Sequence, residues 1–423
     1  MPRRCLPRFA SLVAAFAIAA LACCAPVMVP APIANPQSPY YGRVPPPPPV
    51  ASAPPRPAAP AGPEKVALLV PLSGANAELG QAILDAAQLA LFEAGGDRLT
   101  LVPRDTGGNA AGAANAARAV IGEGARLILG PLLAPEVEAV KPLARDAHLD
   151  VIAFSTVTNL AGGNVFLMGF LPRQEVVREV GYARQHGIDR FAALAPNSPY
   201  GHLMADALQE AASASGGRVT KVEFYDPGAA DSSPAIQRLM PGGGMPGGAG
   251  RGDAAPVSVA PLAPSFDALL LPEGGARLKR IARQVRIAGG DAKPLRLLGS
   301  GLWDVPDIGG EPALVGGWFA SSPPDARQDF ERRYSATYGH NPPRLASLGY
   351  DAAALAAVLA RGQGGEPFSQ QAILNPSGFT GVDGLFRFTP NGLVQRGLVV
   401  LEVDSQGRTV ISPAPQSFQD LAY

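Results

Sequence analysis

The sequence predicts an α/β fold built from two doubly wound parallel-sheet lobes. From Lys65 onward, short runs rich in Val, Ile and Leu alternate with longer Ala-rich segments of helical periodicity, which is the pattern of βαβ units. The length of 423 residues exceeds what one compact core accommodates and suits two lobes. A Pro-rich stretch near the N-terminus indicates a further segment that has no core of its own.

The expected elements alternate along the chain. Strands are expected at residues 66–70, 99–102, 127–129 and 151–154, with helices at 80–95, 110–122 and 136–147 between them. The second lobe is expected to hold a strand at 191–195, a helix at 202–215 and a strand at 266–271. Because ligands of open α/β sheets bind at the carboxyl ends of strands, a site is expected in the loops that follow these strands.

The N-terminal sequence is typical of an export signal. Arg3, Arg4 and Arg8 precede an apolar run at residues 9–22, which has the length of a signal-peptide core. A transmembrane helix needs about 20 apolar residues. Several prolines follow the run at once and would break a helix. Residues 1–22 are therefore predicted to be a signal peptide and not a membrane anchor.

The end of this run resembles the lipobox of bacterial lipoproteins. Ala20, Leu21 and Ala22 precede Cys23, whose thiol would receive the lipid; Cys24 is the less suitable acceptor because a cysteine would then precede the cleavage site. Residues 23–63, rich in Pro and Ala, are expected to be a disordered tether that reaches on the order of 100 Å. No Asp follows Cys23, so the resemblance implies the periplasmic face of the outer membrane, with the inner membrane left open.

The composition and the motifs of the sequence disfavour several classes of function. Lys+Arg and Asp+Glu both total 35, so no net field attracts nucleic acid. All three cysteines lie in the first 24 residues, which excludes thiol chemistry in the folded part. The four histidines lack metal-ligand spacing, and the glycines of residues 242–247 have no preceding strand to make them a phosphate loop. We expect no enzyme activity, no cofactor and no metal.

An ordered set of segments resembles the type 1 periplasmic binding proteins, a family that includes branched-chain amino-acid receptors of ABC transporters. The segments are KVALLVPLSG (65–74), Asp105-Thr106, Gly130-Pro131, VIAFSTVT (151–158), APNSPYG (195–201), Gly349-Tyr350-Asp351-Ala352 and GVDGLFRFTPNG (381–392). The resemblance implies two lobes joined by three crossovers, with the ligand between them. We place lobe 1 at residues 64–170 and 296–376, and lobe 2 at 171–295 and 377–423. A Gly-rich insertion at 240–255 is expected to be a mobile loop.

The resemblance also implies candidate ligand contacts. They are Ser73, Asp105, Ser155, Thr156, Thr158, Tyr200 and Glu273. Hydroxyls and helix N-termini in these loops would hold a carboxylate, and an acid would hold the ammonium. Ser155 and its neighbours could instead only cap the next helix, and Glu273 could be an ordinary acid at a helix N-terminus.

The sequence departs from an amino-acid receptor at one point. Such receptors place a serine shortly after Gly130-Pro131, and residues 132–136 offer no hydroxyl. Residues 151–182 resemble the penicillin-binding protein activator branch of the family, so the favoured interpretation is a lipoprotein that activates a peptidoglycan synthase. The alternative is an amino-acid-binding protein that works with an ABC permease, and a sensor of another ligand is a third reading. The sequence names neither the synthase nor the ligand.

Overall fold

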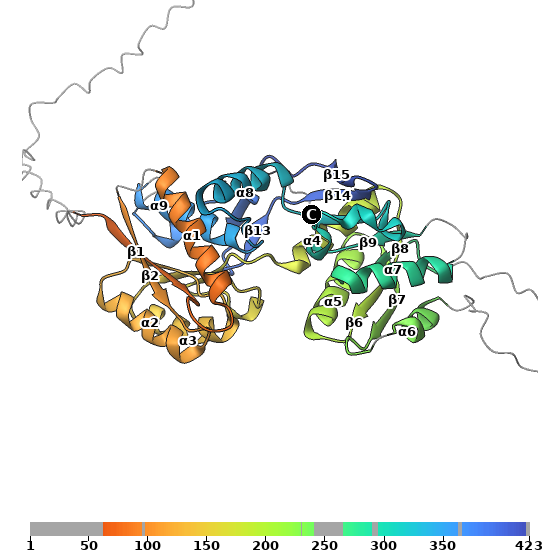
Figure 1. Ribbon diagram of the computed structural model, residues 1–423, viewed down its shortest axis with the longest axis horizontal. Coiled ribbons are helices and arrows are strands. Elements are labelled where there is room, and N and C mark those ends of the chain that lie inside the picture. The colour runs from red at the N-terminus through yellow and green to blue at the C-terminus, as the bar shows by residue number, and fades with distance from the viewer. Residues whose placement is uncertain are drawn as a thin grey trace, which may run out of the picture. The chain divides into compact units, whose positions relative to one another are not determined.

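The strands form two large sheets and one small sheet (Figure 1). The structure is a computed structural model, and it describes residues 62–94, 98–229, 231–240, 265–289, 295–362 and 366–419. The predicted signal peptide, the lipidation site Cys23, nearly all of the predicted tether and nearly all of the Gly-rich insertion lie outside these residues. Within the described ranges, no helix is both long and apolar enough to cross a membrane.

The first large sheet has five parallel strands in the order β2-β1-β3-β4-β5. Their bounds are β1 Glu64–Val70, β2 Leu99–Asp105, β3 Leu127–Leu129, β4 Asp150–Ala153 and β5 Val165–Leu167. The connecting helices are α1 Ala77–Ala94, α2 Ala110–Gly122 and α3 Ala134–Asp146, with a 3-10 turn η1 at Thr158–Leu160. Every connection rejoins the sheet in the parallel sense, as the alternating pattern of the sequence predicts.

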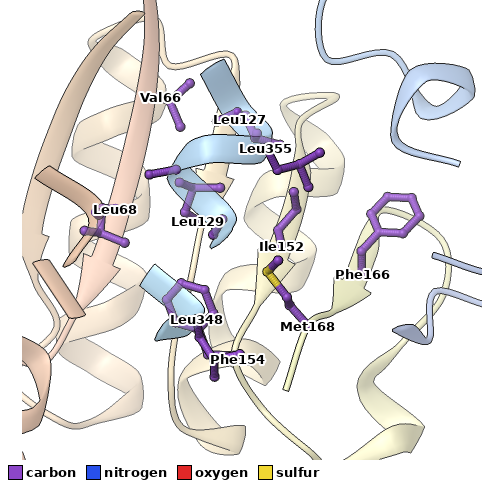
Figure 2. Close-up of a cluster of buried hydrophobic side chains, with 14 of the residues drawn as sticks. Val66, Leu68, Leu127, Leu129, Ile152, Phe154, Phe166, Met168, Leu348 and Leu355 are labelled. Atoms are coloured by element: carbon purple, nitrogen blue, oxygen red, sulfur yellow. The ribbon is translucent and has the colours of Figure 1, made fainter. Parts of the chain in front are cut away.

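Both faces of this sheet are covered, so its strands are apolar on both sides. Val66, Leu68 and Val70 of β1 pack toward α1 and the later helix α9 (Ala346–Ala360), while Ala67 and Leu69 pack toward α2 and α3. Figure 2 shows side chains of β1, β3, β4 and β5 meeting Leu348 and Leu355 of α9. A helix from the second half of the chain thus completes the first core.

The second large sheet has seven strands in the order β15-β14-β10-β9-β8-β6-β7. Their bounds are β6 Arg190–Pro196, β7 Arg218–Tyr225, β8 Ala268–Leu270, β9 Arg296–Leu298, β10 Trp318–Ser321, β14 Val399–Asp404 and β15 Gly407–Ser412. The strands from β7 to β10 are parallel, and the β14–β15 hairpin adds to the edge in the antiparallel sense. Helices α4 (Pro172–Gln185) and α5 (Pro199–Ala214) cover one face, and α6 (Ser233–Leu239) and α7 (Gly275–Gly289) cover the other.

The remaining elements lie between β9 and β14 in sequence. They are the 3-10 turns η2 Gly301–Trp303, η3 Ile308–Gly310 and η4 Pro312–Leu314, the helices α8 Pro324–Tyr338 and α10 Gln370–Ile373, and the small antiparallel sheet β11 Phe379–Gly381, β12 Gly384–Phe388 and β13 Val394–Arg396. Phe386, Phe388 and Val394 of the small sheet enter the same core as α9. The small sheet therefore belongs with the first large sheet.

The sheets divide the chain differently from the predicted lobe boundaries. We define lobe 1 as the five-stranded sheet with α8, α9 and β11–β13, and lobe 2 as the seven-stranded sheet with its helices. Residues 296–321, which we assigned to lobe 1, hold β9 and β10 of lobe 2: β9 pairs with β8, and β10 pairs with β9. Residues 379–396, which we assigned to lobe 2, pack in lobe 1. The sequence of a short apolar strand does not indicate which sheet the strand joins. The sequence pattern therefore could not locate these two crossings.

Gly349 of α9 lies in close contact with the backbone of α1. A Cβ at Gly349 would overlap the carbonyl oxygen of Ile83, whereas a Cβ at Gly122, the last residue of α2, would meet nothing. Gly349→Ala should therefore cost about 1–3 kcal/mol of unfolding free energy through overpacking. Gly122→Ala, the matched control, should be neutral or stabilise by up to about 1 kcal/mol. Urea unfolding measures both, and equal effects at the two positions would contradict this close approach.

Candidate functional site

All three crossings between the lobes border one cavity of about 220 Å³. The first crossing runs from β5 into α4, the second from β10 into α8, and the third from β13 into β14. The cavity is lined by Phe170, Leu171, Pro172, Gln174, Glu175, Tyr200, Gly301, Leu302, Ser321, Ser322, Arg344, Leu345, Arg396 and Leu398. Most of this wall is apolar, and its ionisable groups come from both lobes.

Lobe 2 supplies the acidic side of the cavity through α4. Glu175 stands in the first turn of this helix, and its Oε2 accepts a hydrogen bond of 2.8 Å from the backbone N–H of Gly301. Removal from water raises the pKa of Glu175 to about 7, although Gly301 and Arg344 oppose the rise. This carboxyl therefore gains or loses its proton near neutral pH.

One helical turn later, Glu179 stands behind Glu175. Its side chain is buried, and its Oε1 accepts from the backbone N–H of Ala320 at 3.0 Å, while Oε2 has no hydrogen-bond partner. Burial and then the negative charge of Glu175 raise the pKa of Glu179 well above its usual range. Two carboxyls on one helical face thus disfavour each other's ionisation.

Lobe 1 supplies the basic side through Arg344 and Arg396. Arg344 forms an ion pair of 2.8 Å with the buried carboxylate of Asp383 and lies 3.9 Å from the centroid of the Phe170 ring. Arg396 is 2% exposed, donates to the backbone oxygen of Met168 at 2.7 Å and stacks on Phe170 at 4.8 Å. Its Nε and Nη1 have no hydrogen-bond partner. The aromatic ring of Phe170 therefore has a guanidinium group stacked from each of two lobe 1 segments.

The carboxylates behind these arginines differ in protonation. Burial alone would raise the pKa of Asp383, but Arg344 and Arg396 lower it below its usual value. Asp351 of α9 accepts a hydrogen bond from the backbone N–H of Val382, yet burial and the charge of Asp383 raise its pKa to about 7. Asp383 is thus the ionised partner that holds Arg344 beside the cavity.

Tyr200 is the one predicted site residue, of the seven, that lines this cavity. It lies in the first turn of α5, which Ser198 caps by accepting from the N–H of Gly201. The Tyr200 hydroxyl donates to the hydroxyl of Ser300 at 3.0 Å, and burial raises its pKa. Tyr200 therefore presents a fixed, neutral hydroxyl group next to Glu175.

Ser73 and Asp105 lie together in the loops after β1 and β2. Asp105 Oδ1 accepts from the backbone N–H groups of Leu72 at 2.8 Å, Ser73 at 3.2 Å and Gly107 at 2.8 Å. A hydrogen bond from the Ser73 side chain is the largest of the contacts that lower the pKa of Asp105. The pair joins two loops of lobe 1, and neither residue lines the cavity.

The hydroxyls after β4 and the acid before α7 also lie outside the cavity lining. Ser155 is buried, and its Oγ accepts from the N–H of Val157 at 3.2 Å; Thr156 and Thr158 are exposed. Glu273 accepts from the Tyr225 hydroxyl and from the N–H of Gly274, directly before α7. These contacts match the helix-terminus and local-turn roles that we weighed against ligand binding.

The N-terminus of α3, which follows Gly130-Pro131, holds an acid of its own. Glu136 is fully buried, and its Oε2 accepts from the N–H of Leu133 at 3.1 Å. A carboxylate at this position uses one of the backbone donors that a ligand carboxylate would otherwise use. The missing hydroxyl is therefore accompanied by a buried acid that already uses a backbone donor at this helix terminus.

Comparison with known proteins identifies the family. A family model described as periplasmic binding protein matches residues 63–408, which is most of the chain. The chain belongs to the periplasmic binding protein family. Two lobes joined by three crossings are the architecture of its type 1 members, and members of this family bind ligands and do not act as enzymes. The family also implies that the protein is exported.

Solved structures agree with this fold. A candidate branched-chain amino acid ABC transporter protein from Rhodospirillum rubrum is 21% identical, with a TM-score of 0.69 over 82% of this chain and 100% of that one. The substrate-binding protein LivJ from Streptococcus pneumoniae, in complex with isoleucine, is 19% identical, with a TM-score of 0.56 over 83% and 100%. A solute-binding protein from R. palustris, in complex with benzoate, is 19% identical, with a TM-score of 0.55 over 84% and 97%.

One known sequence relative also matches this periplasmic binding protein. It is an uncharacterized protein from Rickettsia prowazekii, 24% identical over 176 residues, which are 42% of this chain and 46% of the relative. The chain thus spans about half the length of that relative. The match indicates that the two proteins are related, but the relative has no assigned activity to compare.

Sequence reasoning did not find Glu175, Arg344 or Arg396 in this binding protein. The predicted contacts came from the loops after the strands, whereas these three residues lie on α4, before α9 and at the end of β13. These three residues line the same cavity only because the chain crossings lie together. Glu175 lies just after the expected first crossing, and this position could have pointed to it; Arg344 and Arg396 lie far from the expected second and third crossings, so no such signal was available for them.

The raised pKa of Glu175 predicts a pH dependence of stability. The folded protein keeps a proton that the unfolded chain, with an ordinary value of 4.5, gives up. The resulting stabilisation is complete below about pH 4.5 and is lost as the pH rises through about 7. Glu175→Gln should therefore gain on the order of 2 kcal/mol relative to wild type between pH 5 and pH 8. Urea unfolding at both values measures this gain.

Glu138 is exposed on α3 and supplies the control. Glu138→Gln removes the same formal charge away from the cavity, so its difference from wild type should be equal at pH 5 and pH 8. A Glu175→Gln difference that does not change with pH would show that Glu175 titrates as an ordinary surface acid.

Proposed function

We propose that this protein is an exported solute-binding protein that holds a small organic ligand in the cavity at the three crossings and works with an ABC permease. The observation that carries the proposal is that both lobes and all three crossings border this cavity. A ligand held there contacts every segment about which the lobes can rotate. Its binding energy can therefore favour one lobe orientation over another.

The chemistry of the cavity supports a small ligand with an apolar body. Phe170, Leu302, Leu345 and Leu398 form apolar walls between the acid of Glu175 and the guanidinium of Arg344. The volume of about 220 Å³ lies below the range of about 300–1,000 Å³ that is usual for drug-sized ligands. Isoleucine and benzoate, named in the similar structures, are small carboxylic acids with such a body.

Filling the cavity tests this proposal. The Leu302 side chain is 48% exposed at the cavity, and Leu302→Trp should block ligand entry without disturbing a core. A thermal-shift screen of the full-length protein against amino acids and aromatic acids should find a stabilising ligand, because binding to the folded state alone adds about 2.7 kcal/mol at a hundredfold excess over Kd. Leu302→Trp should abolish that shift.

Ile287→Trp is the matched control. Ile287 is 71% exposed on α7 and does not line the cavity, so this variant adds the same ring and should keep the wild-type shift. A ligand whose shift survives Leu302→Trp binds elsewhere, and that result would overturn this choice of site.

The activation of a peptidoglycan synthase is a second candidate function. It is favoured by Glu136, which occupies the helix terminus where an amino-acid carboxylate is expected, and by the absence of a hydroxyl after Gly130-Pro131. The predicted lipid on Cys23 and the tether at 23–63 would give such an activator its reach from the outer membrane. Under this hypothesis, the synthase binds to a surface of the lobes and not to the cavity.

Leu302→Trp and the wild-type protein together separate the two candidate functions. Under the second candidate, the full-length protein should bind a bifunctional penicillin-binding protein and raise its rate of glycan polymerisation or crosslinking. Leu302→Trp should retain that stimulation in full, because a protein partner does not enter a cavity of this size. If the wild-type protein neither binds nor stimulates the synthase, the activator hypothesis is wrong.

A further inference from the structure

After its last strand the chain leaves lobe 2 and reaches back into lobe 1. β15 ends at Ser412, and residues 413–419 continue without helix or strand. Within this segment the side chain of Phe418 is only 7% exposed, and the guanidinium of Arg387 lies 4.4 Å from the centroid of its ring. Arg387 belongs to β12 of lobe 1. We call residues 413–419 the C-terminal strap, because they connect the two lobes without a further crossing of the chain.

Lobe 1 holds Phe418 from two sides. Gly378, directly before β11, has a φ of +71°, and a Cβ at this position would lie 2.5 Å from the Phe418 ring. Glycine therefore allows both the backbone turn and the close approach of the ring. On the other side, Arg387 is fixed by its hydrogen bonds to Gln395 at 2.8 Å and to the backbone oxygen of Pro376 at 3.1 Å. Phe418 is thus an aromatic anchor held by a stacked cation and a glycine.

The beginning of the C-terminal strap is attached to α4 and to the third crossing. Arg178 of α4 donates to the backbone oxygen of Pro413 at 3.1 Å and to that of Leu398, in the third crossing, at 2.9 Å. Pro415 lies against Gly397 of the same crossing, where a Cβ would be 3.4 Å from the proline ring. Leu398 also lines the cavity at the crossings. One guanidinium therefore connects the strap to the wall of that cavity.

The strap is open to solvent space along one side. Residues 413–416 border a second cavity, of about 750 Å³, whose other walls come from α4 and α5. Small residues line its helical side, and a Cβ at Gly181 would meet no atom within 4 Å. The helices therefore do not hold the strap along its whole length. Its position depends on the contacts near its start and on Phe418.

We infer that the C-terminal strap is a conformational restraint, which ties lobe 2 to lobe 1 and limits the rotation of the lobes about their three crossings. A rotation that draws Phe418 away from Gly378 exposes an aromatic ring to water, and this opposes the movement. The match to the family model ends at residue 408, so the strap lies outside the part of the chain that the model describes. The inference goes beyond the proposed function and does not depend on which solute or partner binds.

A single backbone hydrogen bond between the lobes reports their rotation. The N–H of Arg396, in lobe 1, donates to the Gln174 side chain of α4, in lobe 2, at 3.1 Å. The N–H of Val382 donates to Asp351 at 2.7 Å, and both of these residues belong to lobe 1. Rotation of the lobes breaks the first bond and not the second. Hydrogen exchange of the two amides therefore separates rotation from local opening of lobe 1.

Removal of the anchor tests the inference in the full-length protein without ligand. Phe418→Ala should speed exchange of the Arg396 amide by about tenfold or more, because the burial of the ring no longer opposes rotation. Exchange of the Val382 amide and of β1 should keep its wild-type rate. Hydrogen exchange followed at single-residue resolution measures all of these amides.

Phe379→Ala is the matched control. Phe379 of β11 packs against Phe386 in the same small sheet, with ring centroids 5.8 Å apart, so this variant loosens the sheet and leaves the anchor in place. It should keep the wild-type exchange of the Arg396 amide. If both variants speed the same amides equally, Phe418 only packs the small sheet and the inference is wrong.

A milder variant keeps the test decisive if Phe418→Ala does not fold. Phe418→Leu retains an apolar side chain and should speed exchange of the Arg396 amide by a smaller factor, again with Val382 unchanged. An unchanged Arg396 amide in this variant and in any folded Phe418→Ala would overturn the inference. Because the measurement uses no ligand, its result stands apart from the success or failure of the proposed solute binding.

Discussion

The arrangement depends on three chain crossings that lie side by side. Crossing segments are irregular, so their backbone groups need partners that no sheet provides. Gln174 of α4 supplies two of them, since its amide oxygen accepts from the N–H of Arg396 at 3.1 Å and its amide N–H donates to the oxygen of Val394. Arg178 donates to the oxygen of Leu398 at 2.9 Å. The first and third crossings are thus joined through side chains of α4, and the helix that holds Glu175 is fixed by the crossings it borders.

A buried ion pair connects the lobes beside the same place. Arg327 of α8 in lobe 1 lies 2.5 Å from Asp304 of lobe 2, and Arg408 of β15 lies 2.7 Å from the other oxygen of Asp304. Burial would raise the pKa of Asp304, but the hydrogen bond and charge of Arg327 lower it, so the carboxylate stays ionised. Such a pair adds little net stability relative to apolar packing, yet it strongly penalises an arrangement that separates its members. It therefore gives the lobes a defined orientation around the cavity.

The sequence predicted the lobe 1 strands and helices well because their signals are local. β1 is a run of apolar residues buried on both faces, and α2 begins after Asn109, whose side chain caps it by accepting from the N–H of Gly112. The later crossings were misplaced because β9 and β10 are as apolar and short as lobe 1 strands. The cavity was largely missed for a related reason. Tyr200 follows a strand and was found, whereas Glu175, Arg344 and Arg396 are surrounded by ordinary helix and strand residues and acquire meaning only where distant segments meet.

The α3 terminus explains why the amino-acid site looked weakened in the sequence. Glu136 of α3 accepts from the N–H of Leu133, so a backbone donor that a ligand carboxylate could use there is already taken. The guanidinium groups of Arg344 and Arg396 lie instead at the cavity that the crossings border. An acidic solute held there would meet the arginines of lobe 1 in place of a helix terminus. Recognition at the crossings needs no hydroxyl after Gly130-Pro131, and the loss of that hydroxyl is therefore compatible with solute binding.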